Sequence, residues 1–403
     1  MRSGQPWAFE VAPGELLAVD VPAGPAWVPL LHRLWSDGVA FIPLDERLAE
    51  PERQRLLDLA RPAAVLGAGG TTVFAGAAPV DADVAVVMAT SGTGGAPRLV
   101  ELSRSAVQAA VDGSREALAR AGHTVDAPLV SCLTPAHIGG LLVLLRGEVA
   151  DPPSRVTVHE RFDVDRLARE APPAASLSLV PAMVRRLVRA GTDLERFGPM
   201  LVGGGGLEPA DRTGAEALGA SIVETYGLTE SCGGVVYDGV PFEGTHVRLG
   251  HEQRIELQGP TLMQGYRQDG AATGAAFDVH GWLRTGDAGT IDDAGRLYVT
   301  GRLDEAIRTG AETVWPAEVE RAIASHPKVF EVGVAGRPHP EWGQQVVAYV
   351  VPRTIDDPPS LEELRDHASE TIARHKTPRE MVLITEVPRT PGGKVRRGAL
   401  PDG

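Results

Sequence analysis

The 403-residue sequence has no asparagine and only three lysines, Lys328, Lys376 and Lys394, against 36 arginines. Arginine therefore supplies nearly all of the positive charge. In a chain with this composition, a lysine that is kept on a glycine-rich loop, as Lys394 is, becomes a candidate for a specific role.

Cysteine and long apolar runs are also scarce. The two cysteines, Cys132 and Cys232, lie a hundred positions apart, which fits neither the paired spacing of a zinc site nor a disulfide framework. No run of about 18 apolar residues is present to span a bilayer. Glu10 and Pro13 interrupt the N-terminal segment where a signal peptide needs an apolar core. We expect a cytoplasmic protein.

The net charge is −14. An acidic surface repels phosphate backbones and anionic lipids, so nucleic acids and membranes are disfavoured as partners. The charge balance favours small-molecule chemistry.

The length and the pattern of apolar runs predict two domains. From residue 16 to about 300, short apolar runs alternate with helical stretches rich in Ala, Leu and Arg, which is typical of α/β layers. A stretch at 253–291 has frequent glycines and predicts antiparallel strands and turns. A smaller α+β pattern follows, so we expect a large N-terminal α/β domain, 1–303, and a small mobile C-terminal domain, 304–403.

The individual elements are predicted from periodicity and flanking residues. The predicted strands are 84–88, 129–133, 329–334 and 345–351, and the predicted helices are 104–121, 164–170, 316–325 and 361–374.

A glycine- and hydroxyl-rich segment, Thr90-Ser91-Gly92-Thr93-Gly94-Gly95-Ala96-Pro97-Arg98, follows a predicted strand and precedes a predicted helix. Glycine lets the backbone approach a ligand, while hydroxyls, amides and one cation suit phosphates. The segment lacks the Gly-Lys-Ser/Thr end of a Walker loop. By itself it fits a phosphate site or a flexible strand-to-helix loop equally well.

A second polar segment, Glu224-Thr225-Tyr226-Gly227-Leu228-Thr229-Glu230, follows the apolar run 221–223, just beyond an expected strand end. α/β proteins place ligands at such ends. An aromatic ring, a hydroxyl and a carboxylate could stack a purine, donate to phosphate and bind Mg²⁺. A structural turn is the alternative.

Three further segments complete the set. Trp282-Leu283-Arg284-Thr285-Gly286-Asp287 and Thr300-Gly301-Arg302-Leu303-Asp304 supply acids that could accept ribose hydroxyls, although both are also common turn sequences. Pro388-Arg389-Thr390-Pro391-Gly392-Gly393-Lys394 places a lysine on a loop that could deliver a point charge, although such a lysine can also be solvated surface.

In their order and spacing, these five segments resemble the acyl-adenylate-forming (AMP-binding) superfamily. Within it, the chain looks most like the o-succinylbenzoate:CoA ligases of menaquinone biosynthesis, through 226–239, Val314-Trp315-Pro316 and 340–344. The resemblance implies an enzyme that joins a carboxylic acid to AMP with Mg-ATP and transfers the acyl group to CoA. A monomer and a homodimer are both open.

The resemblance also implies roles for individual residues. The nucleotide-binding set would be Thr90, Ser91, Gly92, Thr93, Gly95, Arg98, Tyr226, Gly227, Asp287 and Arg302, with Tyr226 on adenine and the last two on ribose. Glu230 would bind Mg²⁺, and the acyl pocket would contain His137, Gly204, Gly205 and Thr229. The catalytic set would be Lys394, Glu230, Thr229 and His137, and the hinge would be Asp304.

Lys394 would bridge the substrate carboxylate and the α-phosphate in the adenylation step. His137 has a competing interpretation as a buried structural histidine.

Two other functions stay open at this point. The enzyme could activate another aryl or fatty acid, or serve a carrier protein in place of CoA. A nucleotide binder that has lost turnover would account for Gly94, Arg98 and Leu99, which depart from the family pattern of the phosphate loop. Because lysine is nearly absent, Arg98 also fits a general exchange of lysine for arginine.

Overall fold

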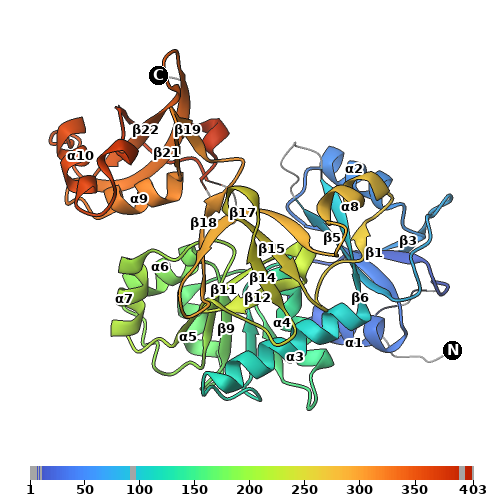
Figure 1. The fold of residues 1–403 in the computed structure, drawn as a ribbon. Coiled ribbons are helices and arrows are strands. Elements are labelled where there is room, and N and C mark those ends of the chain that lie inside the picture. The colour runs from blue at the N-terminus through green and yellow to red at the C-terminus, as the bar shows by residue number, and fades with distance from the viewer. Residues whose placement is uncertain (1–6, 8, 10, 91–96, 390–394, 402–403) are drawn as a thin grey trace. The chain divides into compact units, whose positions relative to one another are not determined.

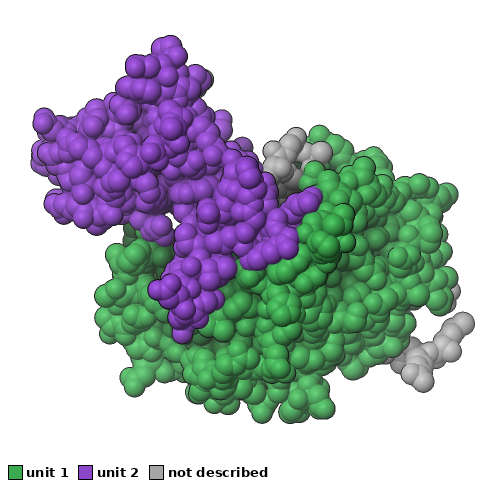
Figure 2. All heavy atoms as spheres, viewed as in Figure 1, with its two compact units in different colours: residues 1–247, 257–283 green, residues 248–256, 284–403 purple. Residues whose placement is uncertain are grey.

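The computed structural model describes residues 7, 9, 11–90, 97–389 and 395–401 (Figure 1). The predicted Ser91, Gly92, Thr93, Gly95 and Lys394 lie outside the described residues. The chain forms two compact units (Figure 2), which are 1–247 with 257–283 and 248–256 with 284–403. The mixed α/β class predicted from the sequence is confirmed.

Unit 1 contains two seven-stranded sheets. The first sheet has the order β16-β6-β5-β2-β1-β3-β4, with parallel pairing among β5, β2, β1 and β3. Its strands are β1 (Leu16–Asp20), β2 (Ala40–Pro43), β3 (Ala64–Gly67), β4 (Gly70–Val73), β5 (Val84–Thr90), β6 (Arg98–Ser103) and β16 (Gly265–Tyr266). Buried strands such as β2 carry apolar residues on both faces, as expected for parallel pairing under helices.

The second sheet has the order β13-β12-β11-β10-β9-β7-β8, and β8 to β11 are parallel. Its strands are β7 (Leu129–Ser131), β8 (Val156–Val158), β9 (Ser176–Leu179), β10 (Met200–Val202), β11 (Ile222–Leu228), β12 (Gly233–Tyr237) and β13 (Val240–Pro241). One buried cluster, which includes Leu177, Met200 and Leu187, packs helices on this sheet.

The helices of unit 1 are α1 (Trp27–Ser36), α2 (Glu50–Ala60), α3 (Arg104–Arg120), α4 (Ile138–Val149), α5 (Val164–Glu170), α6 (Pro181–Arg189), α7 (Pro209–Ala217) and α8 (Gly270–Ala276), with the 3₁₀ turn η1 (Thr229–Ser231). Helix α3 contacts β5 and β6 of the first sheet and β12 of the second. Helix α4 is almost entirely apolar, and 140–145 are all buried, as expected of a helix enclosed by its neighbours.

Unit 2 holds most of a four-stranded sheet and all of a five-stranded one. The first consists of β14 (His246–Leu249), β15 (Arg254–Gln258), β17 (Leu283–Ile291) and β18 (Leu297–Arg302). The second consists of β19 (Ile307–Thr309), β20 (Glu312–Val314), β21 (Val329–His339), β22 (Gly343–Pro352) and β23 (Glu380–Leu383). The helical elements are α9 (Pro316–Ala324), α10 (Leu361–Ser369), η2 (His251–Gln253), η3 (Arg374–Lys376) and η4 (Arg397–Ala399).

Several predicted boundaries were wrong. The phosphate-loop segment does not lead directly into a helix, because β6 pairs with β5 and lies between the segment and α3. Tyr226 and Gly227 lie inside β11, not beyond its end, because the strand runs on to pair with β12. A short helix, α8, interrupts the predicted run of strands and turns, and α10 ends at Ser369.

The predicted domain boundary at 303/304 falls inside unit 2, whose continuous part begins at Arg284. The prediction that Asp304 is a hinge concerns movement of the C-terminal domain, and it stays a prediction. Among the described residues, no helix is both long enough and apolar enough to span a membrane.

Candidate active site

The carboxyl ends of the parallel strands in the second sheet gather several predicted site residues. The chain leaves β7 and reaches His137 at the start of α4, and it leaves β10 into the glycine turn 203–206. Tyr226 to Glu230 form the last part of β11 and the turn after it. Because β7, β9, β10 and β11 run parallel, these segments emerge at one edge of the sheet.

The corresponding edge of the first sheet supplies charged and hydroxyl groups. Asp45 and Arg47 follow β2, and Thr90 ends β5, which pairs in parallel with β2. Thr90 lies opposite Arg98, the first residue of β6, in an antiparallel pair. The predicted phosphate-binding segment is therefore the connection of a β-hairpin, and Thr90 and Arg98 flank it.

Two side-chain contacts join these edges within unit 1. Arg47 Nη2 lies 3.1 Å from His137 Nε2. The Tyr266 hydroxyl donates a hydrogen bond to Glu230 Oε1 at 2.9 Å. Residues predicted for phosphate, metal and acyl binding thus lie on edges that touch each other.

Glu230 has the surroundings that a magnesium ligand needs. Its carboxylate is half-buried, and the backbone carbonyl of Glu230 accepts from Met263 N at 2.8 Å. Within the described ranges, Oε2 has no hydrogen-bond partner, and no group of three or more His, Cys, Asp or Glu could hold a metal without other ligands. A single carboxylate fits Mg²⁺, which keeps several waters and binds largely through substrate phosphates.

Arg98 and Tyr266 form a second contact at this position. The Arg98 guanidinium carbon lies 5.2 Å from the centre of the Tyr266 ring, within the range of a cation–π interaction. Burial, followed by the Glu230 carboxylate, raises the pKa of Tyr266 to about 12. The hydroxyl is therefore protonated at neutral pH and can act as a donor.

His137 is not the buried structural histidine considered above. Its side chain is 64% exposed, although it belongs to the start of the buried helix α4. Arginine has no acceptor atom, so the contact with Arg47 requires that His137 Nε2 accepts. Asp45 holds Arg47 in place through two bonds, to Nε at 2.8 Å and to Nη2 at 2.6 Å.

The glycine turn after β10 packs closely against β11. A Cβ atom at Gly203 would lie 2.4 Å from Thr225 Oγ1, and Gly204 has a φ of +77°, which favours glycine. Gly204 and Gly205 therefore lie on a turn whose path depends on the absence of side chains. Thr229 follows in the turn η1.

In unit 2, Asp287 and Arg302 are direct partners across β17 and β18. Arg302 Nη1 lies 3.2 Å from Asp287 Oδ1, and Arg302 Nε lies 3.2 Å from Asp304 Oδ1. Loss of solvation opposes the charge on Arg302, but Asp304 and Asp287 outweigh it and raise the pKa of Arg302. The predicted ribose pair and the predicted hinge residue thus form one ion-pair cluster.

Sequence reasoning missed Tyr266, Asp45 and Arg47. Tyr266 belongs to a two-residue strand that pairs with β6, more than 160 positions earlier in the chain, and it carries no local signal. Asp45 and Arg47 follow a buried strand end, which was a usable signal.

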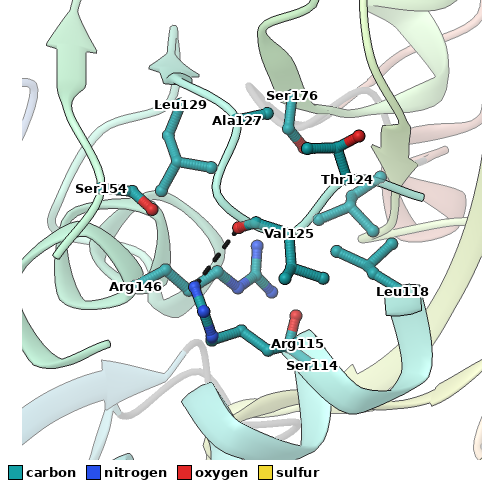
Figure 3. Close-up of a pocket in the computed structure, with 11 residues that line it drawn as sticks. Ser114, Arg115, Leu118, Thr124, Val125, Ala127, Leu129, Arg146, Ser154 and Ser176 are labelled. Atoms are coloured by element: carbon teal, nitrogen blue, oxygen red, sulfur yellow. Dashed lines mark hydrogen bonds between the residues drawn. The ribbon is translucent and has the colours of Figure 1, made fainter. Parts of the chain in front are cut away.

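A small cavity elsewhere in unit 1 contains none of the predicted site residues. Figure 3 shows it beside Arg115 and Arg146, and its volume is about 20 Å³. Tyr237 contacts two of the lining residues, since its phenol oxygen lies 2.8 Å from both Ser114 Oγ and Arg146 Nη2. Such a cavity has room for about one water molecule and cannot hold a nucleotide or an acid.

Comparison with known proteins identifies the family. A model of AMP-binding enzymes matches 69–262, and a model of the AMP-binding enzyme C-terminal domain matches 318–394. A probable 2-succinylbenzoate–CoA ligase of Mycobacterium tuberculosis H37Rv is 38% identical over 337 residues, covering 80% of this chain and 85% of that protein. This chain belongs to the AMP-binding enzyme family.

Other relatives of this AMP-binding enzyme carry related names. A 2-succinylbenzoate–CoA ligase of Bacillus licheniformis is 31% identical over 345 residues, covering 79% of this chain and 70% of that protein. Among solved structures, an o-succinylbenzoate CoA synthetase of Bacillus subtilis with a bound acyl-adenylate has a TM-score of 0.82 and 26% identity, and the match covers 98% of this chain and 89% of that one. The same enzyme solved with ATP and magnesium has a TM-score of 0.82 and 25% identity, covering 97% and 90%.

Proposed function

We propose that this AMP-binding enzyme is an o-succinylbenzoate:CoA ligase. It would use Mg-ATP to convert the acid to its acyl-adenylate, with release of pyrophosphate, and would then transfer the acyl group to CoA. The observation that carries the proposal is the contact between Glu230 and Tyr266. This contact joins the edge of the second sheet, which carries the predicted metal ligand, to the edge of the first sheet, which carries Arg98. The chain is also 38% identical to a protein named for this reaction.

The substrate acid needs no general base. Free carboxyl groups have pKa values near about 4, so the attacking oxygen is already ionised at neutral pH. Bond formation between this oxygen and the α-phosphorus breaks the bond to the pyrophosphate oxygen, and the protein's task is to position the groups and offset negative charge.

Mg²⁺ bound through Glu230 would supply charge neutralisation on the phosphates. Arg98 would contribute a cation from the flank of the phosphate loop, and Lys394, which lies outside the described residues, stays predicted as the contact to the α-phosphate.

In the second step the CoA sulfur attacks the acyl carbon of the mixed anhydride. The bond to the AMP oxygen breaks, and the thiol proton is released to solvent, so the products are the thioester, AMP and one proton. We propose that Asp304 is the hinge and that the loop 308–311 then reaches CoA; Gly310 in that loop has a φ of +62°. The use of ATP and CoA fits the cytoplasmic location expected from the sequence, and the acid would place the enzyme in menaquinone biosynthesis.

The proposal is tested by pyrophosphate release from Mg-ATP with a panel of acids that includes o-succinylbenzoate, benzoate, succinate and a medium-chain fatty acid. The acceptor is tested with free CoA and with a carrier-protein domain, and thioesters are detected by mass. We expect release with o-succinylbenzoate that depends on Lys394, and formation of its CoA thioester.

Other outcomes lead to defined corrections. Release with other acids alone would keep the mechanism and overturn the substrate. Transfer to the carrier domain and not to CoA would overturn the acceptor. The absence of release with any acid would favour a nucleotide binder without turnover.

We expect Asp287→Asn to raise the KM for ATP about tenfold, with little change in the KM for the acid. Asparagine replaces the charged carboxylate, whose two oxygens would accept hydrogen bonds from both ribose hydroxyls, with a neutral amide that has one acceptor oxygen. A hydrogen bond to a charged group contributes about 1.5–3 kcal/mol, so its loss should weaken ATP binding. Initial rates at varied ATP and varied acid separate the two constants. Asp292→Asn, at the turn of the same β17–β18 hairpin, is the matched control, since the Asp292 carboxylate accepts local bonds from Ala294 N, Arg296 N and the Tyr298 hydroxyl. An equal rise in both constants would contradict a ribose contact.

A further inference from the structure

The backbone of Tyr266 is held on two sides. Strand β16 pairs with β6, so that Tyr266 lies opposite Val100, two residues after Arg98. The Tyr266 amide donates to Thr273 Oγ1 of α8 at 2.9 Å. A Cβ atom on the preceding Gly265 would lie 2.8 Å from the Thr273 side chain, so the helix and the strand are in close contact. The backbone position from which the Tyr266 side chain extends is therefore fixed.

The segment that contains Tyr266 holds Glu230 at two atoms. Met263 N donates to the Glu230 carbonyl at 2.8 Å, and the Tyr266 hydroxyl donates to Glu230 Oε1 at 2.9 Å. The first bond fixes the backbone of the turn η1, and the second fixes the orientation of the carboxylate. A phenol has one proton to donate, so only one carboxylate oxygen is engaged.

The second oxygen is left available for a ligand. Of the residues that the structure describes, none bonds to Glu230 Oε2. The arrangement therefore presents a carboxylate with one oxygen hydrogen-bonded to Tyr266 and the other open to a ligand.

The ring of Tyr266 contacts a second functional group. Arg98 is exposed and its guanidinium lies 5.2 Å from the ring centre. One side chain thus contacts both the predicted metal ligand and the cation that flanks the predicted phosphate loop.

We propose that Tyr266 is a positioning residue for adenylation, whose hydroxyl orients Glu230 toward the metal of Mg-ATP and whose ring supports Arg98 beside the phosphates. The inference rests on the proposed function, and it adds to it a residue, Tyr266, that acts through Glu230 and Arg98. It predicts that the two parts of the side chain have separable effects.

Tyr266→Phe and Tyr266→Leu separate these effects. The phenylalanine removes only the hydroxyl and keeps the ring beneath Arg98, so metal binding should weaken while ATP binding without metal changes little. The leucine removes the ring as well, so both should weaken. Loss of a partner that orients a metal ligand costs about 10–100-fold in metal affinity.

The direct measurement is Mn²⁺ binding, followed by electron paramagnetic resonance, in the presence of α,β-methylene ATP, which cannot transfer AMP to the acid because its α–β linkage is not cleaved. We expect Tyr266→Phe to raise the Kd for Mn²⁺ at least about tenfold. The Mg²⁺ concentration that gives half-maximal pyrophosphate release should rise in parallel. Tyr298→Phe is the matched control, because the Tyr298 hydroxyl also bonds a carboxylate, Asp292 Oδ2 at 3.2 Å, on the hairpin turn of unit 2.

A double substitution tests the route of the effect. If Tyr266 acts through Glu230, adding Tyr266→Phe to Glu230→Gln should weaken Mn²⁺ binding by less than about twofold beyond Glu230→Gln alone. An unchanged Kd for Mn²⁺ in Tyr266→Phe, with a normal melting temperature, would overturn the inference. Failure of the proposed function would give another result. The wild type would release no pyrophosphate, but the Kd for Mn²⁺ could still be compared between the wild type and Tyr266→Phe.

Discussion

Glu230→Gln is expected to lower kcat/KM for pyrophosphate release at least about 100-fold. Glutamine keeps the size of the side chain and can still accept the hydrogen bond from Tyr266, but it lacks the negative charge of the carboxylate that usually binds Mg²⁺. Initial rates at increasing Mg²⁺ measure the effect, and high Mg²⁺ should recover part of the rate.

Glu224→Gln is the matched control for this prediction, because Glu224 lies in β11, the strand that leads into the turn η1 with Glu230. Its carboxylate pairs with Arg212 Nη1 at 2.5 Å and both side chains are partly exposed, so the pair contributes at most about 1 kcal/mol. If Glu230→Gln and Glu224→Gln gave the same rate and the same Mg²⁺ dependence as the wild type, Glu230 would not be the metal ligand.

Arg267→Met is expected to destabilise unit 1 by about 3–5 kcal/mol. The Arg267 side chain is 1% exposed and pairs with Glu101 Oε1 at 2.8 Å. It also donates to three backbone carbonyls, those of Ala60 at 2.9 Å, Pro79 at 3.1 Å and Ala78 at 2.6 Å. Methionine fills part of the space but leaves the partly buried Glu101 carboxylate and three carbonyls without this donor. The midpoint of urea unfolding, followed by tryptophan fluorescence, measures the loss.

Arg61→Met provides the comparison on an exposed site. Arg61 is an exposed arginine whose side chain donates to the Gly76 carbonyl, at 3.1 and 2.7 Å, so loss of that side chain should cost less than about 1 kcal/mol. Adding Glu101→Leu to Arg267→Met should restore part of the stability, because the unpaired charge is removed. A midpoint for Arg267→Met equal to that of Arg61→Met would show that the buried pair contributes nothing.

The sequence predicted those parts of the fold that have a local cause. Helix α5 was predicted with the bounds that the structure has, and Asp163 caps it by accepting from Arg166 N at 2.8 Å. Helix α3 was predicted to within one residue at its end, since Ser103 caps its start and its apolar residues repeat with helical spacing. Caps and periodicity are both readable from neighbouring residues.

Features that depend on distant pairing were missed. Strand β6 was not predicted, because its acid Glu101 interrupts the apolar run and is only partly buried, and its partner Arg267 lies far along the chain. The same holds for Tyr266, whose role follows from a two-residue strand. Conversely, Asp287 and Arg302 were selected from their motifs, and their direct pairing across a hairpin is what the structure adds.

The position of His137 has a consequence for evolution and for engineering. The residue occupies the N-cap position of a helix whose next turns are buried, but its side chain makes no capping hydrogen bond and is mostly exposed. Exchanging an exposed side chain usually changes stability by less than about 0.5 kcal/mol. Different groups can therefore occupy this position while the supporting helix stays in place. If His137 lines the acyl pocket, as the resemblance implies, substrate preference could be altered there without loss of the fold.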